Sequence, residues 1–160
     1  MLVTHIAVVD NDDTLLLLLT ELFAAKAWET LPHRDARTAF AVLKREQPDA
    51  ILLDLRLNAA VSGWDVLHQL KMDPGTRSIP VIVWSGAIDD LRHKETWLAE
   101  RSIPTLEKPF EIDDLYETIE AALSHKVQEL AYEQREGKPT CGKEKRSRDR
   151  VTDGWRPGPP

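Results

Sequence analysis

Ala50-Ile51-Leu52-Leu53-Asp54 is the stretch of sequence on which the fold depends. Four apolar residues run directly into a carboxylate, and so short a continuous apolar run is typical of a strand buried on both faces of a parallel sheet. Ligand chemistry in such sheets gathers at the carboxyl ends of the strands. We therefore expect Asp54 to end the central strand at that edge. A strand that ends in an aspartate opening a turn is common, so Asp54 alone does not establish a function.

Strand and helix patterns alternate on both sides of this stretch. Further strand signals lie at 6–9, 28–33, 80–84 and 103–106, and helical periodicity is found near 14–22, 36–43, 63–70, 89–100 and from Asp113 onward. Pro32 and Pro104 lie inside two of the strand signals, and proline cannot donate to a ladder, so we expect these to be edge strands. Five strands alternating with five helices predict an α/β, flavodoxin-like doubly wound parallel sheet with the order 2-1-3-4-5.

The first predicted helix follows a run of acidic and amide residues. Asp12 and Asp13 are good candidates to cap it, because carboxylates there accept backbone N–H groups at its positive end. Leu17 should face away from the sheet. The helical spacing predicts that the sheet-facing residues are Leu15, Leu18, Leu19 and Leu22.

Charge and composition exclude several function classes. The net charge is −6, but residues 1–137 carry −10 and the segment from Lys138 to the end carries +4. The negative charge of residues 1–137 argues against a nucleic-acid-binding groove, which needs positive charge. No apolar run is long enough to span a bilayer, and the N-terminus lacks the basic start of a secretory signal. The single cysteine, Cys141, fits a reducing compartment, so we expect a cytoplasmic protein.

The domain organisation expected from these patterns is one folded unit with a tail. The unit spans 1–136 with a core at about 4–125, and the apolar stripe of the last helix continues to about Tyr132, so this helix should outrun the domain. The last two helices are a candidate homodimer surface. Residues 137–160 are rich in Gly, Pro, Lys and Arg without hydrophobic periodicity, which predicts a disordered basic tail.

Four predicted strands end in groups that are chemically useful together: Asp10, Asp54, Ser85 and Lys108. Two carboxylates close to Asn11 make an oxygen-rich pocket for a hard cation such as Mg²⁺. A carboxylate can act as a nucleophile and hold a phosphoryl group. A lysine and a hydroxyl can then bind the charged phosphoryl oxygens. The set therefore predicts phosphoryl chemistry at this edge of the sheet.

The same segments resemble the receiver domain of bacterial two-component response regulators. The resemblance covers about residues 4–125 and is carried by Ile6-Ala-Val-Val-Asp10, Ile51-Leu-Leu-Asp54, Val81-Ile-Val-Trp-Ser85, Lys108-Pro109-Phe110 and Gly63-Trp-Asp-Val-Leu67. It implies a stand-alone signalling phosphoacceptor rather than an enzyme. The implied phosphodonor is a histidine kinase or phosphotransfer protein, and the implied output is binding to a downstream protein.

The resemblance also implies roles for single residues. Asp54 would accept the phosphoryl group, Ser85 would be the switch hydroxyl that contacts it, and Lys108 would pair with it. The implied Mg²⁺ ligands are Asp10, Asn11, Asp54 and the backbone carbonyl of Arg56.

The chain departs from the family pattern at several positions. Asn11 stands where a second acidic ligand is usual, so Mg²⁺ affinity should fall. Thr105 stands where the family often has an aromatic residue, and the loop 55–63 is one residue longer, without the usual proline. Trp84 is unusually large for the position before the switch hydroxyl, and we interpret it as a core or helix-contact aromatic.

Two alternatives stay open at this point. Asp10-Asn11-Asp12-Asp13-Thr14-Leu15 also fits the nucleophile motif of haloacid-dehalogenase-like phosphohydrolases, with Asp10 as nucleophile and Asp12 as general acid. Against it stand a helix that begins directly at Thr14, the missing cap domain and the missing late acidic pair. The other alternative, motivated by Asn11, is a pseudo-receiver that binds partners without being phosphorylated.

Overall fold

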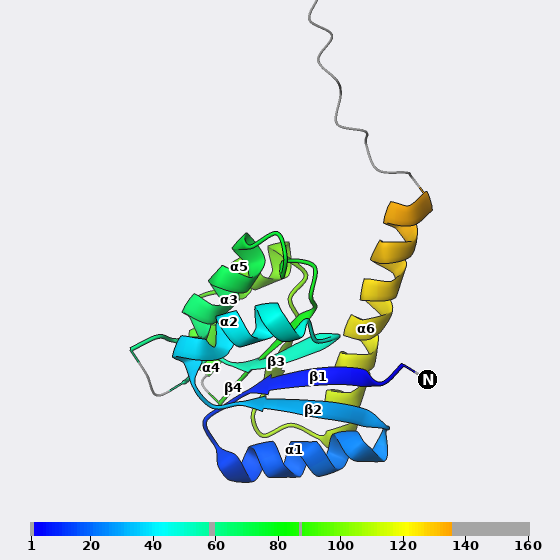
Figure 1. Ribbon diagram of the computed structural model, residues 1–160. Coiled ribbons are helices and arrows are strands. Elements are labelled where there is room, and N and C mark those ends of the chain that lie inside the picture. Colours follow the sequence, from blue (N-terminus) through cyan, green and yellow to red (C-terminus); the bar gives the residue numbers. More distant parts are fainter. Residues whose placement is uncertain (1, 58–59, 87, 136–160) are drawn as a thin grey trace, which may run out of the picture.

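The sheet has the predicted order. The computed structural model describes residues 2–57, 60–86 and 88–135, so the tail expected at 137–160 lies outside the described residues. The five strands are β1 (Thr4–Val9), β2 (Trp28–His33), β3 (Ala50–Asp54), β4 (Val81–Ser85) and β5 (Thr105–Glu107). All neighbours are parallel, in the order β2-β1-β3-β4-β5 (Figure 1). The two proline-containing segments do form the edges, although Pro104 lies just before β5.

Helices connect the strands and cover both faces of the sheet (Figure 1). They are α1 (Asp13–Ala25), α2 (Ala36–Glu46), α3 (Gly63–Met72), α4 (Ile88–Arg92), α5 (Glu95–Glu100) and α6 (Ile112–Arg135). The helix expected at 89–100 is thus divided into two short segments, α4 and α5. Side-chain caps fix the starts of α1, α2 and α3: Asp12 and Asp35 accept backbone N–H groups, and Ser62 with Asp65 forms a capping box.

The core consists of two apolar layers, one on each side of the sheet. Alternate strand residues point to opposite faces, which divides the buried strand residues between the layers. One layer packs α2, α3, α4 and α5 against residues such as Ile51 and Val83, and the other packs α1 and α6 against residues such as Leu52 and Trp84. The central strands β3 and β4 are buried along their whole length, as the continuous apolar runs predict.

The buried face of α1 differs from the prediction. Leu16, Leu19 and Phe23 are buried, whereas Leu18 is 50% exposed, so the assignment of Leu18 to the sheet-facing side was wrong. Leu15 and Leu22 are partly buried against the same layer. Leu17 is 68% exposed, as expected for the opposite side of the helix.

Helix α6 is packed against the sheet only along its first half. Leu115, Ile119 and Ala122 pack in the core, whereas Val127 and Leu130 are 67% and 46% exposed, and the helix extends past the end of the sheet (Figure 1). A homodimer surface on the last two helices stays a prediction. Among the described residues, no helix combines the length and the apolar character needed to cross a bilayer.

Candidate functional site

The ends of β1 and β3 bring Asp10 and Asp54 together. Val9 and Leu53 are partners in the register of these neighbouring strands, and each aspartate is the next residue in its chain. Both carboxylates are almost fully enclosed, with exposed fractions of 1% for Asp10 and 5% for Asp54. Two enclosed carboxylates side by side need a compensating positive charge.

Lys108 supplies that charge. Its Nζ atom lies 2.8 Å from Oδ2 of Asp10 and 3.4 Å from Oδ2 of Asp54. The backbone N–H of Lys108 donates to the carbonyl of Ser85 at 3.0 Å, which fixes the start of the lysine side chain beside the end of β4. One ammonium group therefore serves two carboxylates from two different strands.

The other oxygen of each carboxylate is held by the chain that follows it. Oδ1 of Asp10 accepts the N–H of Asp12 at 2.8 Å, and Oδ1 of Asp54 accepts the N–H of Arg56 at 3.0 Å. These are short turns in which an aspartate side chain binds the backbone two residues on. Asp12 itself caps α1 through the N–H groups of Thr14 and Leu15, as predicted.

Burial shifts the pKa of the candidate phosphoacceptor, Asp54. Removal from water raises the pKa of Asp54 above the ordinary value of 3.8. The hydrogen bond from the N–H of Arg56 and the positive charge of Lys108 oppose this rise, while the negative charge of Asp10 adds to it. The pKa of Asp54 therefore rises despite the adjacent ammonium group.

The remaining predicted residues flank this pair. Ser85 ends β4 and is fully buried, one register position beyond the Asp54–Trp84 pairing. Asn11 is exposed in the loop between Asp10 and the cap of α1, and its side chain makes no hydrogen bond within the described part of the chain. The structure thus brings Asp10, Asp54 and Lys108 into contact and places Ser85, Asn11 and Arg56 in the adjoining positions.

The donor set fits Mg²⁺ with few protein ligands. Within the described ranges, no group of three or more His, Cys, Asp or Glu side chains has the geometry of a metal site. Mg²⁺ commonly keeps several waters and binds through one or two carboxylates, so Asp10 and Asp54 suffice as the charged ligands. The amide of Asn11 and the carbonyl of Arg56 could add neutral oxygens.

Two features of the site were missed at the level of sequence. A Cβ atom added at Gly63 would lie 2.1 Å from the carbonyl oxygen of Asp54, so only glycine permits this approach of α3 to the acceptor strand. The ring of Trp84 lies beneath the ammonium group of Lys108, with 4.1 Å between Nζ and the ring centroid. The glycine before a helical pattern was a signal for the first feature, but no sequence pattern indicated the second.

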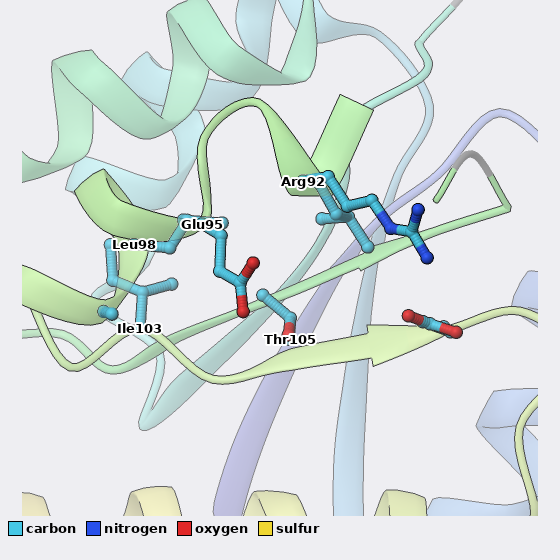
Figure 2. Close-up of a pocket in the computed structure, with 8 residues that line it drawn as sticks. Arg92, Glu95, Leu98, Ile103 and Thr105 are labelled. Carbon is cyan, nitrogen blue, oxygen red and sulfur yellow. The ribbon is translucent and has the colours of Figure 1, made fainter. Parts of the chain in front are cut away.

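Thr105 lines a separate cleft of about 330 Å³ between β5 and the short helices α4 and α5. Leu98 and Ile103 form part of its apolar wall, and the carboxylate of Glu95 points toward it (Figure 2). The small side chain of Thr105 thus leaves open space on the side of β5 that faces α5.

Comparison with known proteins assigns the fold and the family. Residues 6–120 match the family model described as the response regulator receiver domain. The chain is 35% identical over 111 residues to the response regulator PleD of Caulobacter vibrioides. The aligned segment covers 69% of this chain and 24% of PleD. The chain therefore spans about a quarter of the length of that relative.

Two solved structures show the same architecture. The signal receiver domain of a LuxO repressor protein from Vibrio parahaemolyticus superposes with a TM-score of 0.68 at 25% identity, over 82% of this chain and 98% of that one. The receiver domain of a sensor histidine kinase from Pseudomonas aeruginosa, solved with a magnesium ion in its active-site cleft, gives a TM-score of 0.66 at 18% identity, over 77% and 99% of the two chains. The chain belongs to the receiver-domain family of the response regulators of two-component systems.

Proposed function

We propose that this chain is a signalling phosphoacceptor in which Asp54 takes a phosphoryl group from a phosphohistidine. The observation that supports the proposal best is the single ammonium group of Lys108, which lies within reach of both Asp10 and Asp54. An ammonium group in this place can stay with Asp10 and still meet a phosphoryl oxygen on Asp54. The match of residues 6–120 to the response regulator receiver domain supports a phosphoacceptor role for the chain.

In the proposed reaction, a carboxylate oxygen of Asp54 attacks phosphorus as the bond between phosphorus and the donor's imidazole nitrogen breaks. The electron pair of that bond stays on the imidazole, which leaves neutral or takes a proton from water, and Asp54 becomes an acyl phosphate. Lys108 and the hydroxyl of Ser85 bind the phosphoryl oxygens during the transfer. Mg²⁺ bound at Asp10, Asn11, Asp54 and the carbonyl of Arg56 would neutralise further charge on these oxygens.

The exposed side of α1 supports the identity of the phosphodonor. Leu17 and Leu18 are 68% and 50% exposed, and α1 begins directly after the loop that carries Asn11 and Asp12. An apolar helix face beside an acceptor site suits a partner that presents its phosphohistidine on a helix. We infer that a histidine kinase or phosphotransfer protein docks here, and that a downstream protein reads the phosphorylated state.

The test is the intact mass of the protein after incubation with a small phosphodonor and Mg²⁺. One phosphoryl group should be added to the wild type and to Asp49→Asn, which changes the aspartate that directly precedes β3, at the end opposite Asp54. Asp54→Asn should take no label, and a metal chelator should prevent labelling of the wild type.

Two outcomes would contradict the proposal. Label that survives Asp54→Asn but is lost in Asp10→Asn would favour a phosphohydrolase with Asp10 as nucleophile. No label at any Mg²⁺ concentration, with a competent histidine kinase present, would favour a receiver that acts without phosphorylation.

A further inference from the structure

Trp84 lies directly under the acidic site, on the same face of the sheet. In each central strand the residues alternate between faces, and Leu52 and Trp84 belong to the layer beneath α1 and α6. Asp54 follows Leu52 by two residues and is the register partner of Trp84. The indole is thus the last apolar residue of this layer before the carboxylates begin, and it is fully buried.

The ammonium group of Lys108 lies between the two carboxylates and this ring. Its Nζ atom lies 4.1 Å from the ring centroid of Trp84, as well as 2.8 Å and 3.4 Å from the nearest oxygens of Asp10 and Asp54. A cation is attracted to the face of an aromatic ring, and tryptophan gives the strongest attraction of the aromatic residues. Contact with a buried ring is also less weakened by water than contact at an open surface.

The polar group of Trp84 does not explain why a tryptophan occupies this position. Its indole N–H is buried and has no hydrogen-bond partner within the described part of the chain. A buried tryptophan usually uses this donor, and an unpaired buried donor is unfavourable. The face of the ring is the part of Trp84 that meets a charged group, and Phe110 packs against it with ring centroids 5.6 Å apart.

We propose that Trp84 is a positioning residue for Lys108. A lysine side chain has four flexible carbons, so two carboxylates alone leave its ammonium group several positions between them. The ring closes the space below and holds the ammonium group at the height of both Oδ2 atoms. In the reaction proposed above, on which this role rests, the ammonium group is then already beside Asp54 when the phosphoryl group arrives.

The contact can be tested without any phosphorylation. Ring current from the indole should move the proton resonances of the Lys108 ε-methylene upfield in the spectrum of the free protein. Trp84→Phe keeps an aromatic face and should keep part of this shift, whereas Trp84→Leu should lose it. Trp28→Leu is the matched control, because it removes a tryptophan that packs against the same apolar layer without a contact to Lys108.

The positioning role is tested by the rate of labelling with a small phosphodonor at saturating Mg²⁺. Trp84→Leu should label about tenfold more slowly than the wild type, with Trp84→Phe between the two and Trp28→Leu close to the wild type. If Trp84→Leu does not fold, Trp84→Met replaces it, because methionine fills irregular core space without a ring. Thermal unfolding of each variant shows which proteins are folded at the assay temperature.

The outcomes separate this proposal from the phosphoacceptor assignment. Unchanged Lys108 resonances in the folded variant without a ring, or labelling of that variant as fast as Trp28→Leu, would overturn the positioning role. A wild-type protein that takes no label would contradict the proposed function instead, and the lysine resonances would still decide whether the contact exists.

Discussion

Asp10 and Asp54 show how one cation can prepare an acceptor site before any ligand binds. The two carboxylates are enclosed and share the ammonium group of Lys108, while backbone N–H groups hold their other oxygens. Fixed partners of this kind need little reorganisation when charge moves in a reaction. Among the predicted side-chain ligands, Asn11 differs from the two aspartates because it is exposed and contributes no charge.

Replacing that amide by a carboxylate should strengthen Mg²⁺ binding. Asn11→Asp adds a negative charge beside Asp10 and Asp54, and hard cations bind more tightly as the charge of their ligands rises. We expect the dissociation constant for Mg²⁺, measured by titration calorimetry, to fall by about threefold or more. Asn11→Ala removes the amide oxygen and should weaken binding. Equal Mg²⁺ affinities of the wild type and both variants would show that Asn11 is not a ligand of the ion.

Gly63 is the residue whose replacement should damage the acceptor strand most directly. A Cβ there would lie 2.1 Å from the carbonyl oxygen of Asp54 and 2.7 Å from Cα of Leu55, and both are backbone atoms. We expect Gly63→Ala to lower the free energy of unfolding by about 3 kcal/mol in chemical denaturation. Gly86→Ala is the control, because its new Cβ would meet nothing closer than 4.0 Å. Equal stability of both variants would contradict the close approach.

At the scale of elements, the strands could be predicted from sequence better than the helices. An unbroken apolar run such as Ile51 to Leu53 predicts a strand that is buried on both faces, and this strand is buried on both faces in the structure. Five consecutive leucines in α1 have no polar residue among them to mark the exposed side. The burial of Phe23 and Leu16 selects the face that packs, and this places Leu18 at the surface.

The segment between β4 and β5 shows a second limit of prediction from sequence. Residues 89–100 were expected to form one polar helix, and they form α4 and α5 instead. Leu91 and Leu98 are both buried, but too few apolar residues lie between them to pack one continuous helix against the sheet. Lys94, at the start of α5, provides no side-chain cap. Where an apolar stripe is this sparse, the pattern does not determine helix length.

The exposed side of α1 should matter for transfer from a protein donor and not from a small one. Leu17→Glu places a charge on a side chain that is 68% exposed, so folding should be unaffected. We expect phosphotransfer from a histidine phosphotransfer protein to slow by about tenfold or more, since a charge opposes an apolar contact. Labelling by a small phosphodonor should stay unchanged.

The matched control for this prediction is Met72→Glu, at the end of α3, where the side chain is 80% exposed. It should transfer at the wild-type rate from both donors. Equal slowing of both reactions in Leu17→Glu would indicate damage to the fold, and wild-type rates with both donors would exclude this face of α1 as the docking surface.

At the scale of the whole molecule, the site is assembled by topology from distant segments. Asp10, Asp54, Ser85 and Lys108 could be predicted as a group because each stands at the end of a strand, and parallel strands end at one edge. The contact of Trp84 with Lys108 depends on side-chain direction across two strands, and sequence spacing does not give it. Sequence patterns therefore indicate which residues lie at the same edge of the sheet, whereas side-chain direction decides which of them are in contact.

The free energy of unfolding of the whole chain should depend on pH because the carboxyl group of Asp54 is buried. Burial raises the pKa of Asp54 in the folded state, so the folded chain keeps a proton that the unfolded chain has lost above the ordinary pKa of 3.8. Stability should therefore fall as pH rises from that value to the raised pKa, and then stay level. Asp54→Asn removes this cost, so without Mg²⁺ it should be more stable than the wild type at about pH 7 and should lose that advantage in acid.

Asp65 gives the control of opposite sign. Hydrogen bonds from Ser62 lower the pKa of Asp65, so its contribution to stability is present above the ordinary pKa of 3.8 and is lost as pH falls below it. Asp65→Asn should therefore be less stable than the wild type at about pH 7, and the difference should vanish in acid. Chemical denaturation across this pH range measures both differences. A less stable Asp54→Asn at neutral pH would mean that the attraction of Lys108 outweighs the cost of burying the carboxylate.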